Sequence, residues 1–206
     1  MGNRALGERI HSLADPARER AALACMLLAP QVPMLFMGEE YAASTPFLFF
    51  CDFGPELAAA VREGRRAEFA RFAAFADPAN RERIPDPGAL ATFEASKLRW
   101  QERSEGAHHE RLELVRELIR CRRAHVVPRL AGARASGLAE IFNGALRVAW
   151  AMGDGSRLRL TANFQPDAAR VPAEQGEIVW QSGVRASPGG ELALDPGGVR
   201  VLLQHG

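Results

Sequence analysis

The first apolar segment of the chain has the pattern of a buried helix followed by a buried strand. Asp15 can cap the helix, and Pro16 fits its first turn. Ala21 to Leu28 are apolar on every side, as in a helix packed within a larger assembly. Pro30 ends the helix, and Val32 to Met37 has the length and composition of a strand covered on both faces of a parallel sheet. One such unit cannot form a sheet alone, so we expect the chain to be part of a larger protein.

The middle of the chain has the pattern of a long insertion followed by an outer helix. Pro55 begins a helical stretch that Gly64 interrupts. The apolar positions that could share one side of it are Val61, Phe69, Phe72 and Phe75. Residues 77–88 contain three prolines and predict an irregular loop. From His108 to His125, leucine, valine and isoleucine recur at helical spacing among charged residues, which predicts an amphipathic outer helix.

Beyond Pro128 the pattern changes to short alternating runs. Leu146, Val148 and Trp150 alternate with other residues, and Asp154-Gly155 supplies a turn to a second alternating run, which indicates a hairpin. Further short apolar runs lie at Ile178 to Trp180, Leu192 to Leu194 and Val199 to Leu203. Short strands separated by glycine- and proline-rich turns predict an antiparallel β-sandwich.

Composition excludes several classes of protein. Of the 206 residues, 26 are Lys or Arg and 25 are Asp or Glu, so no strongly basic face for a nucleic acid is expected. A membrane helix needs about 20 uninterrupted apolar residues, which the prolines near residue 30 prevent. The three cysteines, Cys25, Cys51 and Cys121, are odd in number and form no C-x-x-C pair. We therefore expect reduced thiols in a cytoplasmic protein, with no metal, no cofactor and no membrane or nucleic-acid partner.

A few polar and aromatic residues are candidates for chemistry. Glu39-Glu40 directly follows the apolar run, and the carboxyl ends of strands carry the active site in parallel α/β barrels. Adjacent carboxylates on a turn are also common as solvated charge, so both interpretations stay open. His108-His109 has no third ligand nearby and favours a solvated helix end. The tryptophans Trp100, Trp150 and Trp180 could stack on sugars, but core packing is the stronger expectation for each.

Several motifs cover most of residues 1–125 in order. They are Gly2 to Arg9, Pro33 to Tyr41, Thr45 to Phe50, Val61 to Arg66 with Glu68-Phe69, Thr92 to Glu94 and Ser96 to Leu98. Together they resemble malto-oligosyltrehalose trehalohydrolases, a family of α-amylase-type glycoside hydrolases. The segments Arg-Glu-Gly-Arg-Arg and Thr-Phe-Glu are the more specific part, since amylases and branching enzymes share the Met-Gly-Glu-Glu motif loosely.

The resemblance implies an α/β plus all-β fold: the last two strand–helix units of a (β/α)8 barrel, followed by an antiparallel C-terminal β-sandwich. Residues 1–125 would be the barrel portion, with a long insertion at 42–105, and residues 126–206 the sandwich domain. On this template, the seventh helix is Asp15 to Ala29, the eighth strand is Val32 to Met37 and the eighth helix is His108 to His125.

The activity implied by the resemblance is retaining hydrolysis of the α-1,4 bond next to a terminal trehalose unit, which releases trehalose from malto-oligosyltrehalose. In relatives, Gly-Asn-Arg-Ala follows an Asn-His-Asp-Gln motif that carries one of three catalytic carboxylates. Here Met1 stands one residue before that glycine. All three carboxylates are therefore expected upstream of Met1, in a missing N-terminal barrel part that would be this chain's partner. We expect no catalytic residue in the chain and no activity from the chain alone.

What the resemblance leaves to this chain is part of a substrate wall. Its expected substrate-binding residues are Asn3, Arg4, Glu39, Glu40 and Tyr41, and the expected ligand is malto-oligosyltrehalose or another glucan. Two alternatives stay open: a non-catalytic glucan-binding or scaffolding module, and part of a related glucan-branching enzyme.

Overall fold

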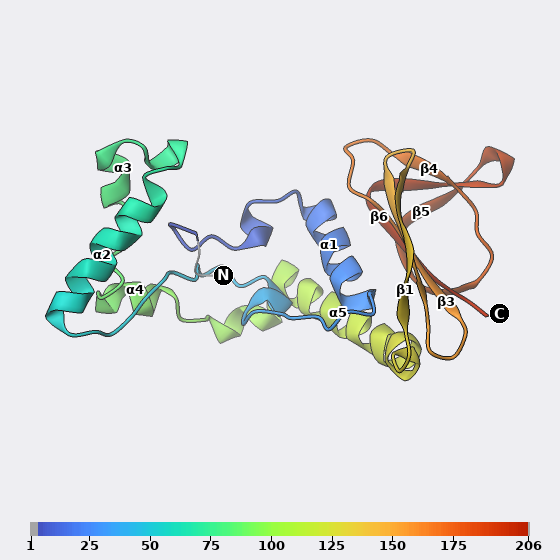
Figure 1. Ribbon diagram of the computed structural model, residues 1–206, viewed down its shortest axis with the longest axis horizontal. Helices are drawn as coiled ribbons and strands as arrows, with labels where there is room; N and C mark the ends of the chain where they lie inside the picture. The colour runs from blue at the N-terminus through green and yellow to red at the C-terminus, as the bar shows by residue number, and fades with distance from the viewer. Residues whose placement is uncertain (1–3, 206) are drawn as a thin grey trace. The chain divides into compact units, whose positions relative to one another are not determined.

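The computed structural model describes residues 4–205, and the chain divides into two compact units (Figure 1). The first unit contains Met1–Leu13 and Leu35–Leu112, and the second contains Ala14–Met34 and Glu113–Gly206. The long helix α5 (Gly106–Cys121) belongs to both. The predicted domains 1–125 and 126–206 differ from this division and stay a prediction about the complete enzyme.

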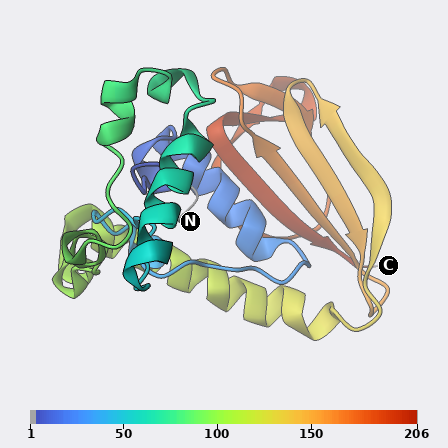
Figure 2. The same ribbon diagram turned by 60° about the vertical axis from the view of Figure 1, so that its left-hand side comes forward.

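The second unit is a helix packed on an antiparallel sheet (Figure 2). Helix α1 (Pro16–Leu28) begins as predicted, because the Asp15 side chain accepts a hydrogen bond of 3.0 Å from the Arg18 backbone N–H. Most of its apolar residues are buried, and the helix packs against strand β6 (Glu191–Gln204). The burial is not all-round, because Ala22 is exposed and Met26 is partly exposed.

The sheet contains six strands within the described residues. Their order is β1-β2-β3-β6-β4, and β5 pairs with β6. The bounds of the other strands are β1 Arg134–Phe142, β2 Ala145–Ala151, β3 Arg157–Asn163, β4 Ala169–Pro172 and β5 Glu177–Ser187. The predicted hairpin is confirmed, since Val148 pairs with Leu160 and Trp150 with Leu158.

The expected antiparallel C-terminal β domain is confirmed, but its division into the two sheets of a sandwich is wrong. The runs at 192–194 and 199–203 both belong to β6. Strand β5 pairs with β6 both before and after the turn signal that separates the two runs. Gly197 bends the strand with a φ of +76°, and a Cβ there would lie 2.5 Å from the Ala17 carbonyl carbon. Continuous pairing with β5 therefore keeps one bent strand where the sequence pattern predicted two.

Arg122 closes the end of α1. It lies in the π-helix η5 (Arg122–Val126), which continues into the short 3-10 helix η6 (Val127–Arg129). Its guanidinium donates hydrogen bonds to the carbonyls of Leu27 at 3.0 Å, Ala29 at 2.5 Å and Gln31 at 2.8 Å. The Leu27 carbonyl is one of the acceptors that a helix end leaves without intrahelical partners, and Ala29 and Gln31 lie in the segment that follows the helix.

The first unit is built from short helices. Their bounds are η1 Ile10–Ser12, η2 Glu39–Tyr41, α2 Pro55–Phe69, η3 Ala73–Phe75, α3 Pro78–Glu82, α4 Leu90–Ala95 and η4 Trp100–Ser104. Helix α2 begins at the predicted Pro55 and continues through Gly64, and the expected irregular loop at 77–88 contains α3. The predicted outer helix is α5, which begins two residues earlier than expected.

The predicted buried strand from Val32 to Met37 is not formed in this structure. Residues 32–36 have no regular secondary structure, and Val32, Met34 and Met37 are 92%, 83% and 51% exposed. A strand needs a neighbour whose N–H and C=O groups complete its ladder. None of the six strands in the described part of the chain pairs with this segment.

Two further observations concern the class of protein. Among residues 4–205, no helix is long and apolar enough to cross a membrane. The three cysteines are free and half-buried, and burial raises the pKa of the Cys25 thiol to about 12. At neutral pH this thiol is protonated, which makes it a poor nucleophile.

Candidate functional site

Asn3 lies outside the described residues, and the other four predicted substrate-binding residues lie in the first unit. They come from two segments that touch, because the Phe47 N–H donates a hydrogen bond of 2.8 Å to the Gly7 carbonyl. Gly7 has a φ of +66°, and a Cβ there would lie 2.6 Å from the Phe47 carbonyl carbon. The structure thus brings the segment of Arg4 against the segment that follows Glu39-Glu40-Tyr41.

Arg9 fixes the loop that carries these residues, although the sequence pattern did not single it out. Its side chain is buried, with Nε 2.6 Å from the Thr45 carbonyl and Nη1 2.9 Å from the Met37 carbonyl. Burial lowers the pKa of Arg9, opposed first by the nearby Glu39 carboxylate. One buried cation therefore holds both ends of the loop from Met37 to Thr45.

Gly38 turns the chain into η2. It has a φ of +84°, and its carbonyl accepts a hydrogen bond of 2.8 Å from the Ala43 N–H. A Cβ at this position would lie 2.7 Å from the Leu98 side chain and 2.8 Å from the Ala43 Cβ. The position therefore requires glycine for both its conformation and its space.

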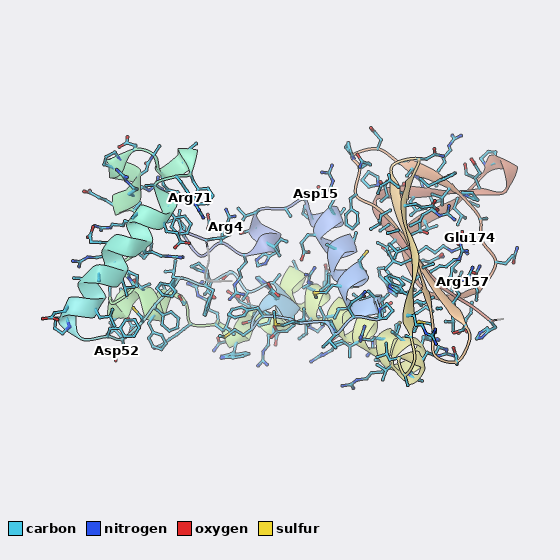
Figure 3. The ribbon with its side chains drawn as sticks, viewed as in Figure 1. Arg4, Asp15, Asp52, Arg71, Arg157 and Glu174 are labelled. Atoms are coloured by element: carbon cyan, nitrogen blue, oxygen red, sulfur yellow. The ribbon has the colours of Figure 1, made fainter. Side chains whose placement is uncertain are left out.

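Arg4, Glu39 and Glu40 keep part of their surface accessible. The Arg4 side chain is 53% exposed, and its Nε lies 3.3 Å from a carboxylate oxygen of Glu8 (Figure 3). Glu39 accepts a hydrogen bond of 2.9 Å from the Phe36 N–H, which fixes its carboxylate at the start of the turn. These side chains can donate to and accept from hydroxyl groups.

Tyr41 has no exposed surface. Its ring centroid lies 6.3 Å from that of Trp100, and its carbonyl lies 3.0 Å from His108 Nδ1. Burial raises the pKa of the Tyr41 hydroxyl, followed by the effect of the Glu40 carboxylate. In this structure Tyr41 therefore supports the turn from beneath, and His108 is a partner of the turn rather than the solvated residue that we expected.

Glu102 anchors the far end of the loop and was also missed. It is 8% exposed, and one carboxylate oxygen accepts a hydrogen bond of 3.0 Å from the Ser44 N–H while the other accepts one from the Ser44 hydroxyl. Burial alone would raise the pKa of Glu102, but the two hydrogen bonds from Ser44 outweigh it and lower the pKa. The sequence holds no local signal for a contact between residues so far apart.

Three buried polar atoms of this cluster have no hydrogen-bond partner within the described part of the chain. They are Arg9 Nη2, Tyr41 Oη and Thr45 Oγ1. Buried polar groups are nearly always paired, with protein or with ordered water. The cluster therefore has donor capacity left for a further polar group.

A cavity of about 340 Å³ lies beside the turn, and its lining is largely aromatic. Met37, which directly precedes Gly38, contributes to its wall. The other lining residues are Phe47, Phe50, Phe93, Ser96, Lys97, Leu98 and Trp100. Trp100 is 52% exposed, so the expectation of core packing is wrong for this tryptophan, whereas Trp150 and Trp180 are buried as expected.

The site therefore combines two carboxylates on the turn of η2 with an aromatic cavity, and Arg4 lies on the neighbouring N-terminal segment. Among residues 4–205, no group of three or more His, Cys, Asp or Glu side chains is arranged to hold a metal ion. Such a surface can bind a neutral ligand that has hydroxyl groups and apolar faces.

Comparison with known proteins gives the class. Residues 133–203 match the family described as "Domain of unknown function (DUF3459)". The solved structure of a putative alpha amylase from Salmonella typhimurium has a TM-score of 0.81 at 37% sequence identity, and the match covers 99% of this chain and 33% of that one. An isomaltulose synthase from Erwinia rhapontici matches at a TM-score of 0.55 and 10% identity, which shows likeness of fold alone. The chain is thus a part of an α-amylase-type protein.

Curated relatives give the particular family. Malto-oligosyltrehalose trehalohydrolase from Arthrobacter ramosus is 39% identical over 206 residues, which is 99% of this chain and 33% of the relative. The enzyme of the same name from Deinococcus radiodurans is 48% identical over 123 residues, 60% of this chain and 20% of the relative. The chain belongs to the malto-oligosyltrehalose trehalohydrolases and spans about a third of the length of the Arthrobacter relative.

Proposed function

We propose that this chain forms the substrate-facing C-terminal part of an enzyme that hydrolyses the α-1,4 bond next to a terminal trehalose unit and releases trehalose. The observation that supports this most strongly is 39% identity to a malto-oligosyltrehalose trehalohydrolase along 99% of the chain. The matched region extends over both units, so it spans the turn with Glu39-Glu40 and the β domain.

In this proposal four side chains contact the hydroxyl groups of the glucan: Asn3, Arg4, Glu39 and Glu40. Their partial exposure and free hydrogen-bonding capacity support this role. Arg9 and Tyr41 act from beneath, because both side chains are buried and both contact the loop that carries the glutamates. None of these residues is assigned as nucleophile or general acid, the two carboxyl groups that a retaining glycosidase holds about 5–5.5 Å apart.

We further propose that the segment Val32 to Met37 is a strand of a (β/α)8 barrel when the rest of the enzyme is present, with α1 and α5 as its neighbouring helices. Its apolar residues are exposed and its backbone has no ladder among residues 4–205. Pairing with another parallel strand would cover both. We expect such an enzyme to be cytoplasmic, since its three cysteines are free.

A chimera tests the proposed activity. Residues 1–206 replace the corresponding third of the Arthrobacter ramosus relative, and the purified protein is assayed for trehalose released from malto-oligosyltrehalose. We expect release by the chimera and none by the 206-residue chain alone. A folded chimera that forms α-1,6 branches in amylose instead would favour the branching-enzyme alternative, and a folded chimera without either activity would refute both.

Variants of the chimera test the substrate wall. Glu39→Gln and Glu40→Gln should each raise KM several-fold, because an amide accepts hydrogen bonds from hydroxyl groups more weakly than a carboxylate does. Glu82→Gln is the matched control, since Glu82 is exposed and lies on α3, away from the turn. Unchanged KM in both site variants would remove the glutamates from the wall.

A further inference from the structure

We propose that the aromatic cavity beside the turn is a binding site for a glucosyl unit of the glucan chain, with Trp100 and Phe93 as its stacking surfaces. This inference rests on the proposed function, which it extends by naming where a sugar ring lies. Its primary support is local: two of the lining side chains, Phe93 and Trp100, are 40% and 52% exposed. Contiguous exposed apolar surface on a folded protein usually marks a binding site.

The walls of the cavity are fixed before any ligand arrives. The rings of Phe47, Phe50 and Phe93 form an edge-to-face series, with centroid separations of 5.8 Å and 5.1 Å. The Ser96 hydroxyl accepts a hydrogen bond of 3.1 Å from the Leu48 N–H and lies 3.0 Å from the Thr92 carbonyl. These contacts connect the segment that carries Phe47 and Phe50 to α4. A preformed site of this kind binds its ligand without the entropy cost of ordering its own loops.

One cation, Lys97, lines the cavity, and a second, Arg103, lies beside one of its lining residues. The Lys97 ammonium lies 4.7 Å from the Phe93 ring centroid, and the Arg103 guanidinium lies 5.0 Å from the Trp100 ring centroid. An ammonium group has three N–H donors and can give them to hydroxyl oxygens around a sugar ring. The apolar faces of the ring would lie on the aromatic side chains, which packs C–H groups against carbon.

Size and position favour the same ligand. The volume of about 340 Å³ is near the lower end of the range of about 300–1,000 Å³ for small-molecule sites, which suits one or two sugar rings. Met37 links the cavity directly to the turn of Glu39-Glu40, so a glucan held at the turn can extend into it. A single chain of sugar units would then contact both surfaces.

The test uses the 206-residue chain and maltotriose. Isothermal titration calorimetry should show saturable binding, and Trp100→Ala should weaken it at least about fivefold, which is about 1 kcal/mol at about 1.4 kcal/mol per tenfold change. Phe93→Ala should weaken it in the same direction. Phe72→Ala is the matched control, because Phe72 is 47% exposed but does not line the cavity, and it should bind like the wild type.

A second measurement needs no substitution in the cavity. Trp100 is the exposed tryptophan of the three, so iodide should quench it and saturating maltotriose should protect it. Absence of saturable binding in a chain with a cooperative unfolding transition would overturn the site. Equal affinity of Trp100→Ala and wild type for maltotriose would also overturn it, because the sugar would then bind elsewhere. Protection of Trp100 by dimer formation in the absence of sugar would overturn it as well, because the occupant would then be a second copy of the chain.

The chimera separates this inference from the proposed function. Trp100→Ala in the chimera should raise KM for malto-oligosyltrehalose at nearly unchanged kcat, because the site holds the ligand away from the bond that breaks. A chimera without trehalose release would refute the proposed function but leave maltotriose binding by the chain intact. Release that is insensitive to Trp100→Ala would overturn the cavity site alone.

Discussion

Gly38→Ala should destabilise the first unit, because the added methyl group meets both a strained backbone conformation and occupied space. Gly38 has a φ of +84°, and the new Cβ would lie 2.7 Å from Leu98 and 2.8 Å from Ala43. It would also lie 3.2 Å from Arg9 Nη1, the atom that donates to the Met37 carbonyl. The methyl group therefore strains the turn and pushes on the cation that holds it.

The magnitude follows from two contributions. A non-glycine residue in the left-handed region costs about 1–2 kcal/mol. Insertion of a methyl group into occupied space costs about 1–3 kcal/mol, and the lower chain entropy of unfolded alanine offsets about 0.4–1 kcal/mol. We expect a net loss of about 2–4 kcal/mol in the free energy of unfolding of this unit.

Hydrogen–deuterium exchange can measure the loss locally. The Ala43 N–H, which donates to the Gly38 carbonyl, should exchange roughly 30- to 700-fold faster in Gly38→Ala, at about 1.4 kcal/mol per tenfold change. Amides of β3, in the second unit, should exchange as in the wild type. Gly64→Ala is the control, because Gly64 lies inside α2 with open space at its Cβ. It should slow exchange in α2 by an amount that corresponds to about 0.5–1 kcal/mol.

Gly38→Asn is a second check on the packing contribution. Asparagine tolerates the left-handed region better than alanine does, but it has the same Cβ and a larger side chain, so it should stay well below the wild type in stability. Equal exchange of wild type and Gly38→Ala, in an experiment where Gly64→Ala behaves as expected, would refute the claim that conformation and close packing require glycine at this turn.

Three other substitutions probe separate parts of the fold. Arg122→Leu should lower the unfolding free energy by about 2–4 kcal/mol in urea denaturation, because it leaves buried carbonyls unpaired, and Arg122→Lys should recover only part of the loss. Glu174→Gln should cost about 1 kcal/mol at low salt and less at 1 M NaCl, because Glu174 pairs with Arg147 and Arg159 on the sheet. Glu102→Gln should make the free energy of unfolding less dependent on pH in the acidic range. The folded-state pKa of Glu102 is lowered by Ser44, so its contribution is present above about pH 4.3 and is lost as the pH falls through the lower folded value. An unchanged pH profile in thermal melts would contradict this role.

Local rules predicted the elements whose causes are local. The Asp15 cap and the Asp154-Gly155 hairpin depend on residues within a few positions, and both lie where expected. The strand at 192–203 was divided wrongly because its turn signal is overridden by pairing with β5, which the local pattern does not contain. The segment at 32–37 has the residues of a strand, but no strand among residues 4–205 pairs with it.

The candidate site was predicted in part for the same reason. Glu39 and Glu40 were found because they follow an apolar run, whereas the burial of Tyr41 depends on Trp100 and His108, more than fifty residues further along the chain. Arg9 was inside a recognised motif, yet its two carbonyl partners lie 28 and 36 residues away. Sequence spacing predicts which residues are polar and adjacent, and tertiary contacts decide which of them reach the surface.

The hydrogen bonds from Arg122 to the end of α1 also affect when this helix end is completed during synthesis. The carbonyls that Arg122 binds are 91–95 residues earlier in the chain. At about 5–20 residues per second, a ribosome adds that length in roughly 5–20 s. For that interval the end of α1 has to rely on water or on another protein for its hydrogen bonds. A nascent chain stalled before Arg122 should therefore leave this helix end open to proteases and chaperones.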